Sequence, residues 1–505
     1  MGSNSLLAGG GLSIPEKEIN LETYIKETLR IGKDLNDRRL VLELAQGGMK
    51  EIEFLKMIGV DLILKPPLGY MVDKKNYPDK MFGGRILIKK LIQEAQKYSH
   101  IQFLPSFFVY KILSQDDQVS GVIGFNKDIK PSLISSKALI LATGGGGGIY
   151  KRNDNHKKIL GDGYALALEM GLPLMDMEFV QFYPFGFAEK GLPQAMIYPP
   201  FPEEVMLSDS EGNDFLKKYG LETSLDKLIV TLRDKTSYLI YKESQMGKVL
   251  MDYTRVPDEK WDQYPLSLFP QQRFNFKEKP FQIAPLAHFF MGGVKINPSS
   301  ETDTPGLFAA GEVAGGVHGA NRMGGNSLAE CLVFGAKAGH GAAEYAKSHT
   351  LKKVSSILDD WPRSLLTGTA DLKNTPKLLT GLRAVRDLSW KCAGPIRNEI
   401  KMKDGLSSVD AWREKLKDLH ISQVRDLILK RELQDSLLVL KVILTASLAR
   451  KESRGALQRE DYPQEGGTEF LRRVSAKIRE ADEDLEVNWE EISPLVSAGR
   501  NDENS

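Results

Sequence analysis

The stretch PGLFAAGEVAGGVHGANRMGGNSLAECLVFG, residues 305–335, limits the fold of this chain more than any other segment. Its apolar run 307–310 predicts a short strand that ends at Gly311 and Glu312, and residues 327–346 have helical periodicity. A strand, a glycine-rich loop and a helix in this order suit a cofactor at the helix N-terminus, where free N–H groups and the helix dipole attract electron-rich atoms. We therefore predict an α/β domain with a cofactor at this junction.

Particular residues of this stretch have predicted roles. Glu312 can accept hydrogen bonds from sugar hydroxyls, and Asn326, Ser327 and Leu328 can aim backbone N–H groups at the carbonyl edge of a ring. Arg322 can reach a molecule that lies against that ring. The alternative is a tight turn between strand and helix with an ordinary surface arginine, since short glycine motifs often match by chance. The length and order of the motif favour the cofactor.

Two other glycine-rich segments can bring backbone close to a flat or phosphate-bearing group, because glycine has no Cβ. A strand over 138–142 runs into a turn with five glycines, for which a flexible hinge is the alternative, and Asp162 precedes a helix over 164–170 that it could cap. Further helices are predicted within 20–60 and over 84–98, and strands over 101–104, 107–113 and 119–125. The predicted cofactor contacts are Ala8, Gly9, Gly10, Ala142, Thr143, Gly144, Glu312, Asn326, Ser327 and Leu328.

The segment GEVAGGVHGANRMGGNSL resembles the C-terminal flavin signature of the succinate dehydrogenase/fumarate reductase flavoprotein family, which includes L-aspartate oxidase. Further matches follow in family order: AGGGL (8–12), ATGGGGGIY (142–150), GDGYALA (161–167), DMEFVQF (176–182), LRDK (232–235), HFFMGGV (288–294) and KESRGALQREDYP (451–463). The resemblance implies an FAD-dependent oxidoreductase that acts on CH–CH bonds, and it adds Asp162 to the predicted cofactor contacts, near the phosphate and ribityl end of the flavin. It also implies a Rossmann-like FAD-binding domain with an inserted α+β capping domain and a C-terminal helical domain.

The resemblance also divides the chain. We expect an FAD-binding domain from residues 1–177 and 288–348, a capping domain from 178–287, a helical domain from 352–480 and a tail from 481–505. Chains that bind FAD in this way normally begin with a strand, G-x-G-x-x-G and a helix, whereas MGSNSLLAGGGL resembles a segment roughly thirty residues later. We expect the sequence to lack that opening, so an inactive truncated product is one of the alternatives.

The chemistry must come from an organic cofactor. The two cysteines, Cys331 and Cys392, cannot ligate an iron–sulfur cluster, and no metal site is expected. The histidine that links flavin covalently in membrane-bound family members aligns with Asn4, so the resemblance implies noncovalent FAD. A net charge of +1 gives no reason to expect nucleic acid. With no apolar run of transmembrane length and no signal peptide, we expect a cytoplasmic protein, or one held at a membrane by partner subunits.

In the family, a hydride moves between the flavin and one carbon of a C–C bond, and a proton moves at the neighbouring carbon. The resemblance assigns the proton to Arg233, and it assigns the grip on a substrate carboxylate to His288 and Arg322. For Arg233 alone, a salt bridge to Asp234 would be the simpler interpretation.

The other half of the family site is replaced by apolar and aromatic residues. The family's His-Pro-Thr-Gly is Tyr183-Pro184-Phe185-Gly186 here, its Thr-Glu pair aligns with Ile197 and Tyr198, and its relay arginine aligns with Phe201. A second carboxylate against such a wall would lack partners. We therefore expect a small carboxylate substrate with an apolar tail rather than succinate or fumarate. The alternatives are an L-aspartate-oxidase-like enzyme and an electron-transfer subunit with an iron–sulfur partner.

Overall fold

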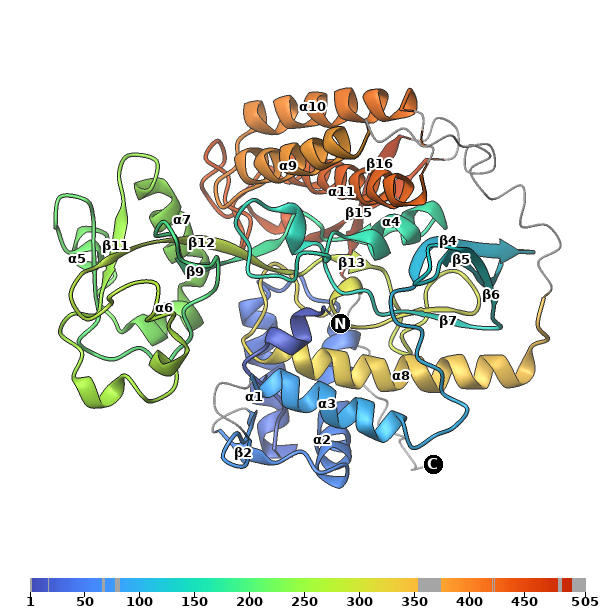
Figure 1. Cartoon of the computed structure of the whole chain (residues 1–505), viewed down its shortest axis with the longest axis horizontal. Helices are drawn as coiled ribbons and strands as arrows, with labels where there is room; N and C mark the ends of the chain where they lie inside the picture. Colours follow the sequence, from blue (N-terminus) through green and yellow to red (C-terminus); the bar gives the residue numbers. More distant parts are fainter. Residues whose placement is uncertain are drawn as a thin grey trace, which may run out of the picture.

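The computed structural model describes residues 2–16, 18–65, 69–77, 82–352, 374–419, 421, 423–479 and 484–492. A large body contains the first and the last described segments of the chain, and one domain, drawn in green, projects from its side (Figure 1). Among the described helices, none has the length and apolar character needed to cross a membrane.

The first part of the body is helical, as predicted. It contains η1 (Asn4–Leu7), α1 (Glu18–Ile31), α2 (Arg38–Met57) and α3 (Gly83–Ala95). The Asp37 side chain caps α2 by accepting a hydrogen bond from the Arg39 N–H at 3.0 Å. Leu40, Leu44, Ile52 and Leu55 are buried along α2, so their helical spacing marks the face that packs inward. Strands β1 (Gly11–Leu12), β3 (Tyr70–Val72) and β2 (Leu62–Leu64) form a small antiparallel sheet beside these helices.

The segment after α3 is mostly β-structure. An antiparallel sheet contains β4 (Phe108–Gln115), β5 (Gln118–Phe125) and β6 (Pro131–Ser135). The strand predicted over 101–104 is wrong, because this alternating segment has no pairing strand and leaves Ile101, Phe103 and Leu104 exposed. Strand β7 (Leu139–Leu141) pairs in parallel with β14 (Leu307–Ala309), as expected for a Rossmann-like domain.

Short elements connect these strands to the long helix of the signature. The first are η2 (Gly147–Ile149), α4 (Asp162–Glu169) and β8 (Leu174–Met175). After the inserted domain, β13 (Gly293–Val294), β14 and η5 (Gly311–Val313) lead to α8 (Asn326–Ser348), which runs below β4, β5, β6 and β7 in Figure 1. The strand and the helix predicted from the signature are both confirmed.

The projecting domain is entered and left by two paired strands. β9 (Val180–Phe187) and β12 (Phe281–Phe290) are antiparallel neighbours, and β11 (Val249–Asp252) and β10 (Met206–Ser208) extend their sheet. Helices α5 (Phe215–Lys218), α6 (Leu225–Thr231) and α7 (Arg233–Glu243) complete the domain, with η3 (Asp258–Lys260) and η4 (Leu266–Leu268). Its hydrophobic core contains only residues between Tyr183 and Ile283. This inserted domain contains both helices and strands, which agrees with the predicted α+β class of the insertion.

The C-terminal region is helical and then returns to a sheet. Helices α9 (Asn374–Cys392), α10 (Glu399–Lys417) and α11 (Val424–Ala449) pack together above the body in Figure 1. After η7 (Thr468–Phe470), β15 (Arg472–Ile478) and β16 (Leu485–Glu491) form a hairpin, and β15 also pairs with β8.

The predicted boundaries of the helical domain and the tail are therefore wrong over this hairpin. Alternation places Val474 and Ala476 in the core, so the segment is stable as a strand against β8. Residues 493–505 of the predicted tail lie outside the described residues.

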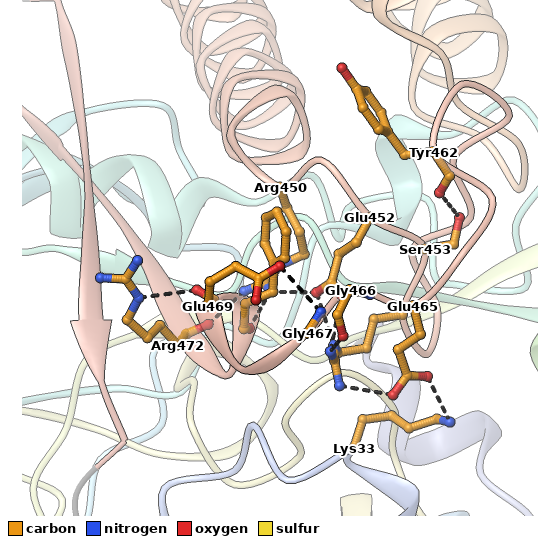
Figure 2. A network of polar contacts seen from close by, with 12 residues as sticks. Lys33, Arg450, Glu452, Ser453, Tyr462, Glu465, Gly466, Gly467, Glu469 and Arg472 are labelled. Atoms are coloured by element: carbon orange, nitrogen blue, oxygen red, sulfur yellow. Dashed lines mark hydrogen bonds and ion pairs between the residues drawn. The ribbon is translucent and has the colours of Figure 1, made fainter.

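A network of ion pairs fixes the loop after α11 to the body (Figure 2). Arg450, which is fully buried, contacts Glu178 at 2.8 Å and Glu452 at 2.9 Å. At the edge of the network, Glu465 contacts Lys33 of the N-terminal region at 3.1 Å. Buried charges are tolerated when they have such partners, so this network holds the C-terminal loop in place.

Candidate functional site

A cavity of about 1560 Å³ lies between the body and the inserted domain. It is lined by the N-terminal segment, the turn after β7, the loop before α8 and residues of the inserted domain. Sites for drug-sized ligands usually occupy about 300–1000 Å³. This cavity therefore has room for a large cofactor together with a substrate.

Ala8, Gly9 and Gly10, three of the predicted cofactor contacts, line the cavity. The backbone of Gly10 has φ +96°, and a Cβ there would lie 2.7 Å from the Cα of Gly83. Glycine is therefore required where this segment crosses the start of α3.

The turn after β7 forms another wall of the cavity. Ala142, Thr143 and Gly144 all line it, and Gly144 has φ +77°, which favours glycine. The Oγ1 atom of Thr143 is buried and has no hydrogen-bond partner in the described part of the chain. Buried hydroxyls are normally paired, so this atom fits a polar group of a bound cofactor.

Glu312 lies where β14 ends and also lines the cavity. Its carboxylate accepts hydrogen bonds from the Phe290 N–H at 3.1 Å and from Nδ2 of Asn4 at 3.4 Å. Burial raises the pKa of Glu312 to about 7. A hydroxyl donor from a cofactor would stabilise the charged form, which is the role predicted for this residue.

The N-terminus of α8 faces the same space through Ser327 and Leu328. The residue that precedes the helix, Gly325, has φ +85° and gives no side-chain cap. The first N–H groups of a helix have no partner within the helix, so they are suited to an electron-rich edge of a ring.

Two predicted cofactor contacts need correction. Asn326 does not line the cavity, because its N–H donates to the Met323 carbonyl at 3.2 Å and its Oδ1 accepts from the Tyr24 hydroxyl at 3.0 Å. Asp162 also does not line the cavity. Its carboxyl is buried near Glu432 and Arg431 of α11, and burial is the main reason why the pKa of Asp162 is raised. The first turn of α4 thus points the Asp162 side chain toward the helical region.

Arg322 and Arg233 both line the cavity; Arg322 is buried, and Arg233 is partly buried. Arg322 donates to Oε1 of Gln181 at 2.9 Å and to the Met323 carbonyl at 3.3 Å, while its Nε has no partner within the described chain. Its guanidinium lies 4.7 Å from the ring centre of Phe289. Burial, followed by repulsion from Arg233, lowers the pKa of Arg322 to about 9.

Arg233 begins α7 and donates only to main-chain carbonyls, those of Ile229 at 2.9 Å and Arg322 at 3.4 Å. The salt bridge to Asp234 is not formed, because Asp234 instead accepts from Nδ2 of Asn321 at 2.5 Å. Within the described residues, neither arginine has a carboxylate hydrogen-bond partner. Two guanidiniums that line one cavity and make no hydrogen bond to a described carboxylate are suited to bind an anion.

His288, the third predicted catalytic residue, also lines the cavity. Its Nδ1 lies 2.8 Å from Oδ2 of Asp154, and the side chains are 25% and 10% exposed. The structure thus adds Asp154, which also lines the cavity and which the sequence analysis missed. A single aspartate in the loop RNDNH carries no periodic or motif signal.

Two of the four predicted substrate-pocket residues line the cavity. Their hydroxyls donate to main-chain carbonyls, Tyr183 to Ile197 at 2.8 Å and Tyr198 to Leu7 at 2.9 Å. The prediction is wrong for Ile197 and Phe201, which are 1% and 7% exposed in the core of the inserted domain. An alignment could not separate cavity from core here, since both environments favour apolar side chains. The apolar residues of the inserted domain that do line the cavity are Ala195, Met196, Pro199, Pro200, Ile229 and Val230.

Comparison with known proteins agrees with this geometry. Residues 1–328 match the FAD binding domain family, and residues 383–497 match the fumarate reductase flavoprotein C-terminal family. An uncharacterised FAD-dependent oxidoreductase of Methanocaldococcus jannaschii is 31% identical over 92% of this chain and 87% of its own length. One of the subunits of the CoM/CoB fumarate reductase of Methanothermobacter marburgensis is 29% identical over 89% of this chain and 85% of its own length.

The fold is also similar to a solved structure. E. coli quinol fumarate reductase FrdA has a TM-score of 0.84 and 26% identity, over 97% of this chain and 90% of that chain. The glycine walls, the uncapped N-terminus of α8, the free Thr143 hydroxyl and the Glu312 carboxylate fit the flat and polar parts of FAD. This chain is an FAD-dependent oxidoreductase and belongs to the succinate dehydrogenase/fumarate reductase flavoprotein family.

Proposed function

We propose that this oxidoreductase reduces the C=C bond of a monocarboxylate with an apolar tail, or catalyses the reverse dehydrogenation. One observation carries the proposal. Two guanidiniums without carboxylate hydrogen-bond partners among the described residues line a cavity to which the inserted domain contributes mainly apolar residues.

Arg322 and Arg233 would hold the single carboxylate. The unpaired Nε of Arg322 and the remaining N–H groups of both guanidiniums can donate to it. Negative charge that develops on the substrate during reduction would be stabilised at the same place. The buried position strengthens both effects, because electrostatic interactions are stronger where water is excluded.

The wall formed by the inserted domain would contact the tail. The hydroxyl protons of Tyr183 and Tyr198 are already given to main-chain carbonyls, so these residues present ring surface rather than free donors. Ile229 and Val230 extend the surface. A second carboxylate buried there without partners would cost several kcal/mol, on the order of the penalty for burying an unpaired charge.

FAD would be held by residues 8–10, the turn 142–144, Glu312 and the N-terminus of α8, and it would supply or take the hydride. Ser327 and Leu328 would donate N–H groups to the ring, and Arg322 would orient the substrate carboxylate. The inserted domain contributes part of the cavity lining and would help to exclude water from a bound substrate.

A dicarboxylate is the second candidate substrate, because Lys74 lines the same cavity. Its Nζ lies 3.9 Å from the ring centre of Tyr264, and burial lowers the pKa of Lys74. Lys74 could therefore reach a second carboxylate from the side of the body. In that case Lys74→Met would raise KM for a dicarboxylate and leave KM for monocarboxylates unchanged.

We infer that a partner protein exchanges electrons with the flavin through iron–sulfur centres. The described residues contain no cluster of metal ligands, and the chain has only two cysteines. The similar M. marburgensis protein is named as part of a multi-subunit enzyme.

An L-aspartate-oxidase-like activity is less favoured, because aspartate would place a second carboxylate against the apolar wall, although the L-aspartate oxidase of Pyrococcus horikoshii is 28% identical.

Ligand binding tests the proposed substrate class without turnover. Flavin difference spectra of the FAD-loaded protein would be titrated with saturated monocarboxylates of increasing tail length and with succinate. We expect Kd to fall as the tail grows, by about tenfold for each 1.4 kcal/mol of buried apolar surface. Tighter binding of succinate than of every monocarboxylate would contradict the proposal and favour the dicarboxylate site at Lys74.

A further inference from the structure

A network of side-chain hydrogen bonds connects the inserted domain to Arg322. It starts at Asp234 of α7, whose Oδ2 accepts from Nδ2 of Asn321 at 2.5 Å. Oδ1 of Asn321 accepts from Nε2 of Gln181 at 2.6 Å, and Oε1 of Gln181 accepts from the Arg322 guanidinium at 2.9 Å. Asn321 and Arg322 belong to the loop before α8, whereas Gln181 lies near the start of β9. This amide network therefore joins two parts of the molecule that both line the cavity.

The two ends of the amide network have opposite hydrogen-bonding properties. An ionised carboxylate only accepts hydrogen bonds, and a guanidinium only donates them. Each amide between Asp234 and Arg322 must therefore turn its NH₂ group toward the carboxylate and its oxygen toward the guanidinium. Both amides have this orientation, and the Arg322 N–H also donates to Oδ1 of Asn321 at 2.9 Å. The carboxylate of Asp234 thus determines which atom of Gln181 meets the Arg322 side chain.

Neighbouring contacts hold the amide network in place. Gln181 is fully buried, and its Nε2 also donates to the Arg322 carbonyl at 3.2 Å. The hydroxyl of Ser237, three residues after Asp234 on α7, donates to the Phe182 carbonyl on β9 at 2.8 Å. These contacts keep α7 against β9 and leave the Gln181 amide little freedom to turn.

We propose that Asp234, Asn321 and Gln181 are positioning residues that hold the Arg322 guanidinium in the orientation that binds the substrate carboxylate. This inference rests on the proposed function only in the role of Arg322, so it applies to a monocarboxylate and to a dicarboxylate. Gln181 takes up one donor of the guanidinium, while Nε, which has no partner in the described part of the chain, is left for the ligand. Because Asp234 belongs to the inserted domain, carboxylate binding by Arg322 depends on contact between α7 and the loop before α8.

The test exchanges the two partners of the hydrogen bond between Asp234 and Asn321. In Asn321→Asp, two carboxylates meet and repel each other. In the double variant, Asp234→Asn with Asn321→Asp, the new amide donates to the new carboxylate, so the orientation of Gln181 is unchanged. Burial raises the pKa of Asp234 to about 6, whereas Arg233 and Lys33 favour its ionised form. Kd is therefore measured at about pH 8, where this carboxylate is ionised, from flavin difference spectra with hexanoate and with succinate.

We expect Asn321→Asp to raise Kd about tenfold or more, because a hydrogen bond to a charged group is worth at least about that factor. The double variant should bind within about threefold of the unchanged protein, since the two substitutions compensate each other. All variants should keep their FAD. The control is Asp258→Asn, whose carboxylate is 85% exposed on the inserted domain, and it should leave Kd unchanged.

Gln181→Met breaks the amide network without adding a charge, and it tests the inference even if Asn321→Asp does not fold. It should also raise Kd about tenfold while FAD stays bound. A double variant that binds no better than Asn321→Asp would overturn the inference. So would a Gln181→Met protein that unfolds at a lower temperature but keeps its Kd, because the contact would then support only the fold.

The two ligands separate this inference from the proposed substrate. If the expected changes occur but succinate binds more tightly than hexanoate, the amide network has its proposed role and the apolar-tailed substrate is wrong. If hexanoate binds more tightly and none of these variants changes its Kd, the substrate class stands and the inference is wrong. If neither ligand binds the FAD-loaded protein, both proposals are wrong.

Discussion

Replacing Arg322 by methionine tests whether this buried arginine contributes to the stability of the fold or to the binding of substrate. Its guanidinium is buried, lacks a carboxylate partner and has a pKa lowered to about 9, mainly by burial. Breaking a buried ion pair normally destabilises a protein by about 3–5 kcal/mol. Here the substitution removes an unpaired charge, and exchanging buried charge for apolar volume has stabilised proteins by about 1–4 kcal/mol.

One partner would be left behind. Oε1 of Gln181 would lose the donor that now lies at 2.9 Å, at a cost of about 1–3 kcal/mol for an unsatisfied buried acceptor. The stabilisation from removing the buried charge and the destabilisation from the unsatisfied Gln181 acceptor are of similar size and nearly cancel. We therefore expect the unfolding temperature of substrate-free Arg322→Met to stay close to that of the unchanged protein, although a fully buried arginine has been removed.

In contrast to the unfolding temperature, the enzymatic activity of Arg322→Met should fall strongly. A substrate carboxylate buried beside residue 322 would lose its charged partner, a loss of about 2–5 kcal/mol. At 1.36 kcal/mol per factor of ten, kcat/KM should fall about 30- to 5000-fold while FAD stays bound. The assay is steady-state enoate reduction with a reduced dye, together with thermal unfolding.

Arg85→Met is the matched control for both measurements, because Arg85 is exposed on α3 outside the cavity. It should change neither the unfolding temperature nor kcat/KM. A loss of stability of about 3 kcal/mol or more in Arg322→Met, with little loss of activity, would mean that the guanidinium supports the fold and not an anion site.

Three further predictions concern FAD. Acid precipitation of the loaded protein should release flavin into the supernatant, because Asn4 stands where a linking histidine would be required; flavin in the pellet would demand another attachment residue. Burial raises the pKa of Glu312 from 4.5 to about 7, so the folded, FAD-free protein binds this proton more tightly than the unfolded chain does. Its free energy of unfolding should therefore decrease as the pH rises from 4.5 to 7, and this decrease should be smaller in Glu312→Gln. Gly144→Ala should lower the flavin-to-protein ratio by straining a residue with φ +77°. Gly339→Ala, in open space on α8, should leave the ratio unchanged, and equal ratios in the two variants would refute the role of the turn.

The sequence predicted those parts of the molecule that follow from local pattern. The strand at 307–309 and helix α8 were predicted because a buried strand, glycines and helical periodicity occur in order. The turn after β7 was predicted in the same way, and Ala142, Thr143 and Gly144 all line the cavity. Each feature depends on residues close together in the chain.

The wrong predictions concern the orientation of side chains and contacts between residues that lie far apart in the chain. Asp162 begins a helix as predicted, but its side chain points toward α11, which lies more than 250 residues later in the chain. Ile197 and Phe201 were placed in the pocket by alignment, yet the fold buries them in a core. Asp154 was missed because its partner, His288, lies 134 residues later in the chain.

The substrate preference tests the central claim most directly. FAD-loaded enzyme with a reduced dye would be assayed for kcat/KM with fumarate and with 2-enoates whose tails lengthen stepwise. The apolar wall formed by Tyr183, Tyr198 and Ile229 predicts that kcat/KM rises with tail length and exceeds the value for fumarate by at least about tenfold, the ratio expected for 1.4 kcal/mol of apolar contact. If fumarate is reduced tenfold faster than every enoate, the wall does not contact the substrate and the enzyme takes a dicarboxylate.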